Sequence, residues 1–224
     1  MAFCQIGVSC EPKVIGVNNG IYQCEIDKKQ FGNEKYYTDF VLSFSREESI
    51  NDCLNRAKKP LLANLLKKAK ITDFMGYAPN LRGIPFAVSK NALRILQKFN
   101  LGEFNTIELK FSNSEVGSYY LIWFPFIEAD MINFKQSILY YRSRLTQPKE
   151  YHLVGNYEEY LALFEKYRFN TFFKKISLNA SKENCDFVQM RVGGNFISKR
   201  LLEALIDNGM TGLTVKTQIE LDYK

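Results

Sequence analysis

The chain has 224 residues, of which 46% are hydrophobic and 24% are charged, and its formal net charge is +6. A chain of this length can bury a sizeable core, and this composition is ordinary for a folded protein, which excludes a disordered or low-complexity chain. No apolar run is long enough to span a bilayer, so we expect no membrane partner. The N-terminus lacks a basic leader followed by an apolar stretch, so we expect no export signal and a cytoplasmic location.

The first 48 residues predict a β-rich N-terminal lobe. Val14–Val17 and Ile21–Ile26 flank Asn18-Asn19-Gly20, which is a strong tight-turn signal, and together they favour a hairpin. Phe40–Phe44 predicts a further strand. The polar segment Lys28–Lys35 then predicts a loop between these strands.

The hydrophobic period changes after residue 49. Asn51–Lys59 and Leu61–Ala69 predict two helices separated by Pro60, which disfavours helix at the residue before it and suits a first helical turn. The second helix would bury one aliphatic stripe, made of Leu61, Leu62, Leu65, Leu66 and Ala69.

Positive charge is concentrated in this same segment. Between Cys53 and Thr72 there is no acid, and the six cations are Arg56, Lys58, Lys59, Lys67, Lys68 and Lys70. Lysines clustered in this way could contact phosphate or an acidic protein surface. The more common role of such lysines is a solvated polar face whose aliphatic stems cover apolar side chains.

A strand, a capped helix and a second strand occur twice in the chain. Ser198 follows a strand end and precedes a helix with an apolar stripe, and Gly209 stands where that helix ends. The segment Phe86–Phe111 repeats the design, since Val88-Ser89-Lys90 matches Ile197-Ser198-Lys199. Ser89 and Ser198 are therefore expected to cap helices.

The remaining segments complete an α+β prediction. Tyr119–Phe124 predicts a strand covered on both faces, and Asn156–Glu159 predicts a capping box that opens a helix. Further strands are expected at Ile138–Tyr141, Phe172–Leu178 and Phe187–Val192. We expect one domain over residues 1–224, with a possible β lobe at 1–48 and a core at 49–224. Its sheet would be mixed but largely antiparallel, with helices packed on it.

Residues that could carry catalysis lack the partners that catalysis needs. His152 is the only histidine and has no acid or nucleophile motif near it. The pairs Glu47/Glu48, Glu158/Glu159 and Glu128/Asp130 are more simply solvated or helix-capping acids. Gly193-Gly194 is a tight turn without a phosphate-loop pattern. We expect no enzyme.

Five cysteines are scattered along the chain without a CxxC pair: Cys4, Cys10, Cys24, Cys53 and Cys185. A zinc site or a disulfide framework would need closer and more regular spacing. We therefore expect reduced and mostly buried thiols, no metal and no cofactor.

Four segments resemble a family of bacterial immunity proteins that was first catalogued as a domain of unknown function. They are Ile71–Phe74, Pro85–Lys90 with its leucine-rich helix, Asp130–Ser137, and the unit from Phe196 to Leu213. The resemblance covers about residues 60–215. The chain departs from the family's pattern at Asn133, where an acid is expected.

This resemblance implies a cytoplasmic, non-catalytic protein that binds a cognate secreted toxin and blocks it. Because the chain is basic, the toxin surface that it covers is expected to be acidic or neutral. The candidate partner-binding residues are Lys59, Lys67, Lys68 and Lys70. The alternative reading is a nucleic-acid-binding module that uses the Arg56–Lys70 segment.

Overall fold

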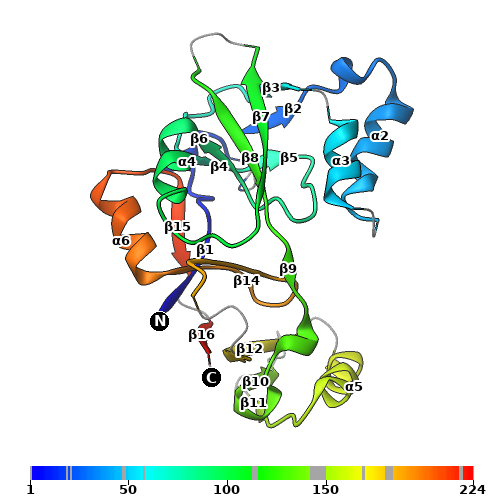
Figure 1. The fold of residues 1–224 in the computed structure, drawn as a ribbon, viewed down its shortest axis with the longest axis vertical. Coiled ribbons are helices and arrows are strands. Elements are labelled where there is room, and N and C mark those ends of the chain that lie inside the picture. Colours follow the sequence, from blue (N-terminus) through cyan, green and yellow to red (C-terminus); the bar gives the residue numbers. More distant parts are fainter. Residues whose placement is uncertain are drawn as a thin grey trace.

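The computed structural model describes residues 2–18, 20, 22–46, 49–57, 59–112, 116–141, 150–167, 170–179, 184–216 and 219–223. Within these residues the chain forms six α-helices, three short 3₁₀ helices and three sheets, each of which mixes parallel and antiparallel pairs. The α+β class is therefore as predicted. The single sheet expected from the sequence is wrong, because the strands separate into three sheets (Figure 1).

The largest sheet has seven strands in the order β4-β6-β8-β7-β3-β2-β5. Their bounds are β2 Cys24–Ile26, β3 Leu61–Leu65, β4 Phe74–Met75, β5 Tyr77–Ala78, β6 Ala87–Ser89, β7 Asn105–Phe111 and β8 Tyr119–Trp123. Only Gly76 separates β4 from β5, yet these strands stand at opposite ends of the order, so the sheet curls into a nearly closed barrel. Leu61, Leu109 and Leu121 are fully buried in its interior.

Helices α2 (Glu34–Ser43) and α3 (Ile50–Arg56) and the 3₁₀ helix η1 (Lys28–Phe31) pack together against this barrel (Figure 1). The strand predicted at Phe40–Phe44 is thus wrong, and the predicted loop at Lys28–Lys35 contains η1 and the start of α2. Phe40 and Phe44 lie one helical turn apart, and their rings meet edge to face at 5.4 Å. That contact is typical of a helix, because residues four positions apart lie on the same helix face.

The helix predicted at Leu61–Ala69 is also wrong. Leu61 and Ala63 point into the barrel while Leu62 and Asn64 are exposed, which is the alternation of a strand. Strand β3 pairs with β2 on one side and β7 on the other. These long-range pairings decide the conformation of the segment, although its leucine spacing is that of a helix. The preceding helix prediction, Asn51–Lys59, is confirmed by α3 within a few residues at each end.

The predicted N-terminal hairpin is wrong as well. Residues 12–15 form α1 (Pro12–Ile15), which has proline in its first turn and Gly16 in the left-handed conformation at its end. Proline at a first helical turn and glycine after the last are the local signals for this helix. The strands of this region do not pair with each other, since β1 (Phe3–Val8) and β2 belong to different sheets.

The second sheet has the order β15-β1-β14-β13-β9. Its other strands are β9 Phe126–Ile127, β13 Phe187–Met190, β14 Gly194–Ser198 and β15 Leu213–Lys216. Helices α4 (Lys90–Leu96) and α6 (Lys199–Asp207) lie against each other and share one core with both sheets (Figure 1). Leu96 and Leu201 are buried at this junction.

Both helix caps predicted from the sequence are confirmed. The Ala92 N–H donates to the Ser89 hydroxyl at 3.1 Å, and the Leu201 N–H donates to the Ser198 hydroxyl at 3.2 Å. Each helix follows a strand and precedes another, as the repeated design requires.

The third sheet has the order β11-β10-β12-β16 and packs with α5 at the far end of the molecule from α2 (Figure 1). Its elements are β10 Ile138–Tyr141, β11 Glu150–His152, α5 Tyr157–Tyr167, β12 Thr171–Leu178 and β16 Glu220–Tyr223. Two 3₁₀ helices, η2 (Ala129–Met131) and η3 (Phe134–Gln136), lead into it. The predicted capping box is confirmed, because the Glu159 N–H donates to Asn156 and the Glu159 carboxylate accepts from the Gly155 N–H.

Candidate functional site

The four lysines predicted to bind a partner lie at the two ends of β3. Lys59 precedes the strand, whereas Lys67, Lys68 and Lys70 follow it. A strand rises about 3.3 Å per residue, so the ends of β3 alone are about 13 Å apart. The lysines therefore do not form the single helix face that the sequence predicted. They instead mark both ends of the β2–β3 ribbon, by which we mean the paired strands β2 and β3.

Lys70 has a structural role at one end of this ribbon. Its ammonium donates to the Lys13 carbonyl at 2.8 Å, and its backbone N–H donates to the Ile15 carbonyl at 2.8 Å. Both acceptors belong to the last turn of α1. This contact brings Lys13 beside Lys70, and we call Lys13, Lys67, Lys68 and Lys70 the lysine patch. Lys13 was missed from sequence because more than fifty residues separate it from the others.

A cleft of about 430 Å³ opens against the middle of the β2–β3 ribbon. Glu25 lies opposite Asn64 of β3 and Ala78 of β5, so one row of residues across three strands forms the floor. Tyr37 of α2 forms one wall, and the ammonium of Lys28 lies 5.3 Å from the centre of its ring. The remaining lining residues are Ile26, Asp27, Lys29 and Pro79.

Two carboxylates line this cleft: Asp27 accepts from the Lys29 N–H at 2.9 Å, and Glu25 acts on two tyrosines. Tyr22 donates a hydrogen bond to Glu25, and this bond together with the negative charge of Glu25 raises the pKa of Tyr22. The pKa of Tyr37 is raised by burial first and by the charge of Glu25 second. Lys28 and Lys29 line the same cleft, yet no cation that the structure describes lies within ion-pair distance of Glu25.

A second cleft, of about 530 Å³, lies on the other side of α2. Phe31 and Phe40 form its aromatic floor, and Tyr36, Asp39 and Arg56 line its walls. Tyr36 is 62% exposed, which is high for an aromatic side chain. Clefts of 300–1,000 Å³ with a few placed polar groups are the usual size of binding sites. Both faces of α2 therefore carry a cleft of that size.

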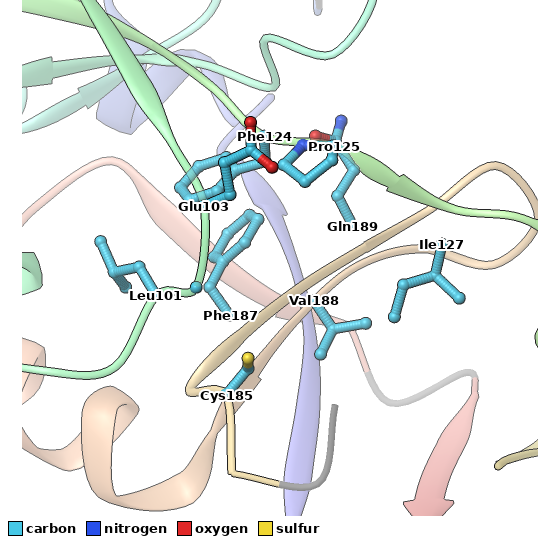
Figure 2. A pocket seen from close by; sticks show the side chains of 10 residues that line it. Leu101, Glu103, Phe124, Pro125, Ile127, Cys185, Phe187, Val188 and Gln189 are labelled. Carbon is cyan, nitrogen blue, oxygen red and sulfur yellow. The ribbon is translucent and has the colours of Figure 1, made fainter. Parts of the chain in front are cut away.

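A much smaller cavity, of about 20 Å³, lies where the first two sheets meet (Figure 2). The rings of Phe124 and Phe187 stack beside it at 3.9 Å, and Leu101, Ile127 and Val188 are among the residues that line it. This volume holds about one water molecule. It is a packing gap between two sheets and too small for a ligand.

Exposed aromatic side chains also gather on the third sheet. Tyr151, Tyr140 and Phe172 lie opposite one another on β11, β10 and β12, and we call these three residues the aromatic row. The rings of Tyr140 and Phe172 stack at 5.6 Å, and Tyr151 and Phe172 are exposed. The row lies far from the β2–β3 ribbon and is a separate surface (Figure 1).

The residues considered for catalysis have structural roles. His152 packs its ring beside Tyr167 at 5.5 Å, and its Nε2 is enclosed without a hydrogen-bond partner. The hydroxyls of Ser89 and Ser198 each donate to an aspartate, Asp73 and Asp186 respectively, while they cap their helices. In each pair the hydroxyl oxygen also accepts a backbone N–H from the first turn of the helix, which is the geometry of a helix cap.

The acidic and glycine candidates are likewise part of the framework. Glu128 forms an ion pair with Arg191 at 3.0 Å, and Glu159 belongs to the capping box of α5. Gly193 and Gly194 turn between β13 and β14 with positive φ angles, and a side chain at Gly193 would strike Ile176. Glu47 and Glu48 lie outside the described residues.

The five cysteines are free thiols. Cys24 and Cys53 are buried, and burial raises the pKa of Cys24 to about 12, which makes its thiol inert. Cys4 and Cys185 are half-buried and Cys10 is exposed, so the prediction of mostly buried thiols holds for only two of the five. Among the described side chains, no three His, Cys, Asp or Glu residues gather in a way that could hold a metal ion.

No protein-family model matches this sequence, and no curated protein is significantly similar to it. In the part of the chain that the structure describes, no helix is both long enough and apolar enough to cross a membrane.

Proposed function

We propose that this protein is an immunity-type inhibitor that binds a cognate secreted bacterial toxin in the cytoplasm as a stoichiometric complex. The family resemblance of residues 60–215 supports the class of function. The observation that carries the proposal is the concentration of binding features on one group of neighbouring elements. Two clefts of binding-site size, the exposed Tyr36 and the four predicted lysines lie on β2, β3, η1, α2, α3 and the segments that join them, and we call this part of the molecule the candidate face.

The chemistry of this face suits a protein partner. Tyrosine and arginine are the residue types that most often anchor protein interfaces, and Tyr36 and Arg56 line the larger cleft. Exposed lysines at both ends of the ribbon would steer an acidic partner toward the face and speed its association. A rigid inhibitor of this kind buries about 800 Å² on each partner. The barrel supplies that rigidity, because the strands beneath the face are packed on a filled core.

Co-expression tests this proposal. We expect a secreted toxin to be encoded beside this protein. Its toxin domain should arrest growth alone, and co-expression with this protein should restore growth. The two proteins should then co-purify at one to one. Tyr36→Ala should weaken the complex about tenfold, because truncating an anchor residue commonly costs 1–2 kcal/mol.

Tyr151→Ala is the matched control for that variant. Tyr151 is also an exposed tyrosine, at 55%, but it belongs to the aromatic row. The complex should tolerate its loss. If Tyr151→Ala weakens the complex and Tyr36→Ala does not, the toxin docks on the third sheet and the proposed face is wrong. Growth rescue without any complex would instead return an enzymatic mechanism to consideration.

Nucleic-acid binding is the second candidate, and the lysine patch is the observation that favours it. The bond from the Lys70 ammonium to the Lys13 carbonyl adds Lys13 to the three lysines that follow β3, so four lysines belong to adjoining segments. A protein that neutralises several phosphates loses affinity steeply as salt rises. Titration of fluorescent single-stranded DNA and RNA at about 50 and 200 mM salt distinguishes the two functions, because an inhibitor of a toxin should bind neither.

A further inference from the structure

The cleft on the β2–β3 ribbon presents an unusual order of charges. Lys28 and Lys29 stand at its rim, Glu25 lies on its floor, and the lysine patch begins about three residues further along the ribbon. The order of formal charges along the ribbon is thus positive at Lys28 and Lys29, negative at Asp27 and Glu25, and positive at the lysine patch. A carboxylate between two groups of lysines would ordinarily be neutralised by one of them. Here it is held by Tyr22 and pairs with none of the cations in the described chain.

The walls of the cleft are suited to a cation. Tyr37 presents its ring beside Glu25, and an aromatic face attracts ammonium and guanidinium groups within about 6 Å. The ammonium of Lys28 already lies 5.3 Å from the centre of this ring. The side-chain amide of Asn64 is next to Glu25 on the floor and accepts a hydrogen bond from Ser112 at 2.8 Å, which holds its orientation. Ala78 and Pro79 supply apolar contact for an aliphatic stem.

We propose that this cleft receives an arginine or lysine side chain of the partner protein, whose charged group pairs with Glu25 and lies against the ring of Tyr37. Arginine fits better, because its planar guanidinium can pair with a carboxylate and stack on a ring together. The partner surface around that residue is acidic, since it must also meet the lysines at both ends of the ribbon. An acidic surface with one central basic residue is complementary to this face, and the mismatch rejects wholly acidic partners.

The identification of the occupant as a partner protein rests on the proposed function. The chemistry of the cleft does not, so a small probe can test it separately. The probe is N-acetyl-arginine amide, and the control probe is N-acetyl-citrulline amide, which has the same shape but no charge. Titration of the ¹⁵N-labelled protein should move backbone signals near Glu25 and Asn64 with the arginine probe, with a dissociation constant on the order of 10 mM. The citrulline probe should move them at least about tenfold less.

Three variants sharpen this test. Glu25→Gln should weaken arginine binding about tenfold, because the charge pair is lost while the Tyr22 hydrogen bond can remain. Lys28→Ala should strengthen arginine binding about two- to threefold. The Lys28 ammonium competes with the probe for the ring of Tyr37, and the substitution removes it. Glu108→Gln is the matched control, since Glu108 lies on β7 and contacts Lys110 at 3.9 Å, outside the cleft. It should change nothing, and all three variants should keep the melting temperature of the wild type.

The same variants measured against the toxin separate the two proposals. Glu25→Gln should raise the dissociation constant of the complex about tenfold, mainly through faster dissociation, and Glu108→Gln should not. Equal shifts with both probes, or arginine binding that survives Glu25→Gln, would show that the cleft does not select a cation. If a one-to-one complex forms but ignores Glu25→Gln, the cleft proposal fails and the inhibitor stands. If the arginine probe binds but no complex forms, the cleft stands and the inhibitor fails.

Discussion

The two strand–helix–strand units are the same structure assembled from different parts of the chain. The first has the strand order β4-β6-β8-β7, and the second has the order β13-β14-β1-β15. In the first unit the third strand of this order, β8, is the next strand after β7 in the chain. In the second unit β1 takes that place and comes from the N-terminus. The four-stranded sheet with its capped helix is therefore the repeated unit, whichever stretch of chain supplies the inserted strand.

In each unit an aspartate forms two hydrogen bonds with the capping serine. We call each of these aspartates, with its hydrogen bonds, a bracket. The backbone carbonyl of Asp73 accepts from the Ser89 N–H at 2.8 Å, and Asp186 accepts from the Ser198 N–H at the same distance. In each pair the serine hydroxyl then donates to the aspartate carboxylate. One backbone bond and one side-chain bond thus fix the start of each helix against the preceding strand.

The second carboxylate oxygen of each aspartate reaches into the other unit. Asp73 accepts from the backbone N–H and the hydroxyl of Thr211, both at 3.0 Å, in the loop after α6. Asp186 accepts from the Asn100 N–H at 3.0 Å, in the loop after α4. The units therefore hold each other reciprocally, and neither bracket is complete without the other half of the molecule.

The brackets differ in their electrostatics. The side chain of Asp186 is fully buried and forms two bonds of 2.6 Å with the guanidinium of Arg200. Asp73 is only half-buried, and Asn91 stands where the second unit has Arg200. The first bracket is thus a set of hydrogen bonds at a partly solvated site. The second is a buried charge whose neutrality depends on one arginine.

The largest expected effect follows from that difference. Asp186→Ala removes the acceptor for Ser198, Arg200 and Asn100 together, and should lower the free energy of unfolding by about 3 kcal/mol. Asp73→Ala should cost about 1–2 kcal/mol, because water can replace part of the lost bonding at a half-buried site. Urea denaturation of both variants measures the two costs. Equal losses would mean that the brackets are equivalent and that Arg200 adds nothing.

Acid should weaken the second bracket. Burial acts to raise the pKa of Asp186, but hydrogen bonds from Arg200 and Ser198 outweigh it, and the pKa is lowered below its ordinary value. A lowered pKa in the folded state means that the stabilisation is complete above the unfolded value of about 3.9 and is lost as the pH falls below it. The difference in unfolding free energy between the wild type and Asp186→Asn should therefore shrink between about pH 5 and pH 2. A constant difference across that range would contradict the assignment.

Replacing the capping serine should also lower the free energy of unfolding more in the second unit than in the first, but by a smaller amount. Ser89→Ala should cost about 1 kcal/mol, which is the usual loss for a helix cap. Ser198→Ala should cost about 2 kcal/mol, since it also leaves the buried carboxylate of Asp186 short of a donor. Thermal melts of the two variants, compared with their urea midpoints, check the order. A larger loss at Ser89 would overturn the ranking of the two brackets.

Local signals were sufficient to predict these units but not their connection. Ser89 and Ser198 each precede an apolar helical period, and cap chemistry acts within three residues, so both caps could be predicted from the sequence. The aspartates could not, because Asp73 and Asp186 act on loops more than eighty residues away. The place of β1 inside the second unit could not be predicted either, because its partners β14 and β15 are far away in the sequence.

The errors lie where long-range pairing or an overlooked cap decided the structure. Leu61–Leu65 has helical leucine spacing, but it pairs with β2 and β7 and forms a strand of the barrel. Phe40–Phe44 looks like a strand until Asn33 is recognised as the cap of α2. These two errors misplaced the candidate site, since the predicted lysine face became the two ends of a ribbon. The Glu25 cleft could not be anticipated, because its floor comes from three separate strands.

The smallest expected effect comes from making the first unit resemble the second. Asn91→Arg would place a guanidinium at the position that corresponds to Arg200. A bond to Asp73 there would be partly solvated and should add only about 0.5 kcal/mol. Asn91→Lys is the control, since it adds the same charge without the paired donors. A gain with arginine and none with lysine would show that the units share their geometry at this position.

The most direct test of the proposed function is a titration of toxin activity with the purified protein. The candidate toxin domain found in the co-expression test is held at a concentration well above the dissociation constant, and its activity is followed as this protein is added. Stoichiometric binding predicts that activity falls linearly and ends at one equivalent. Complete loss at a small fraction of one equivalent would mean that one molecule inactivates many, which contradicts inhibition by binding.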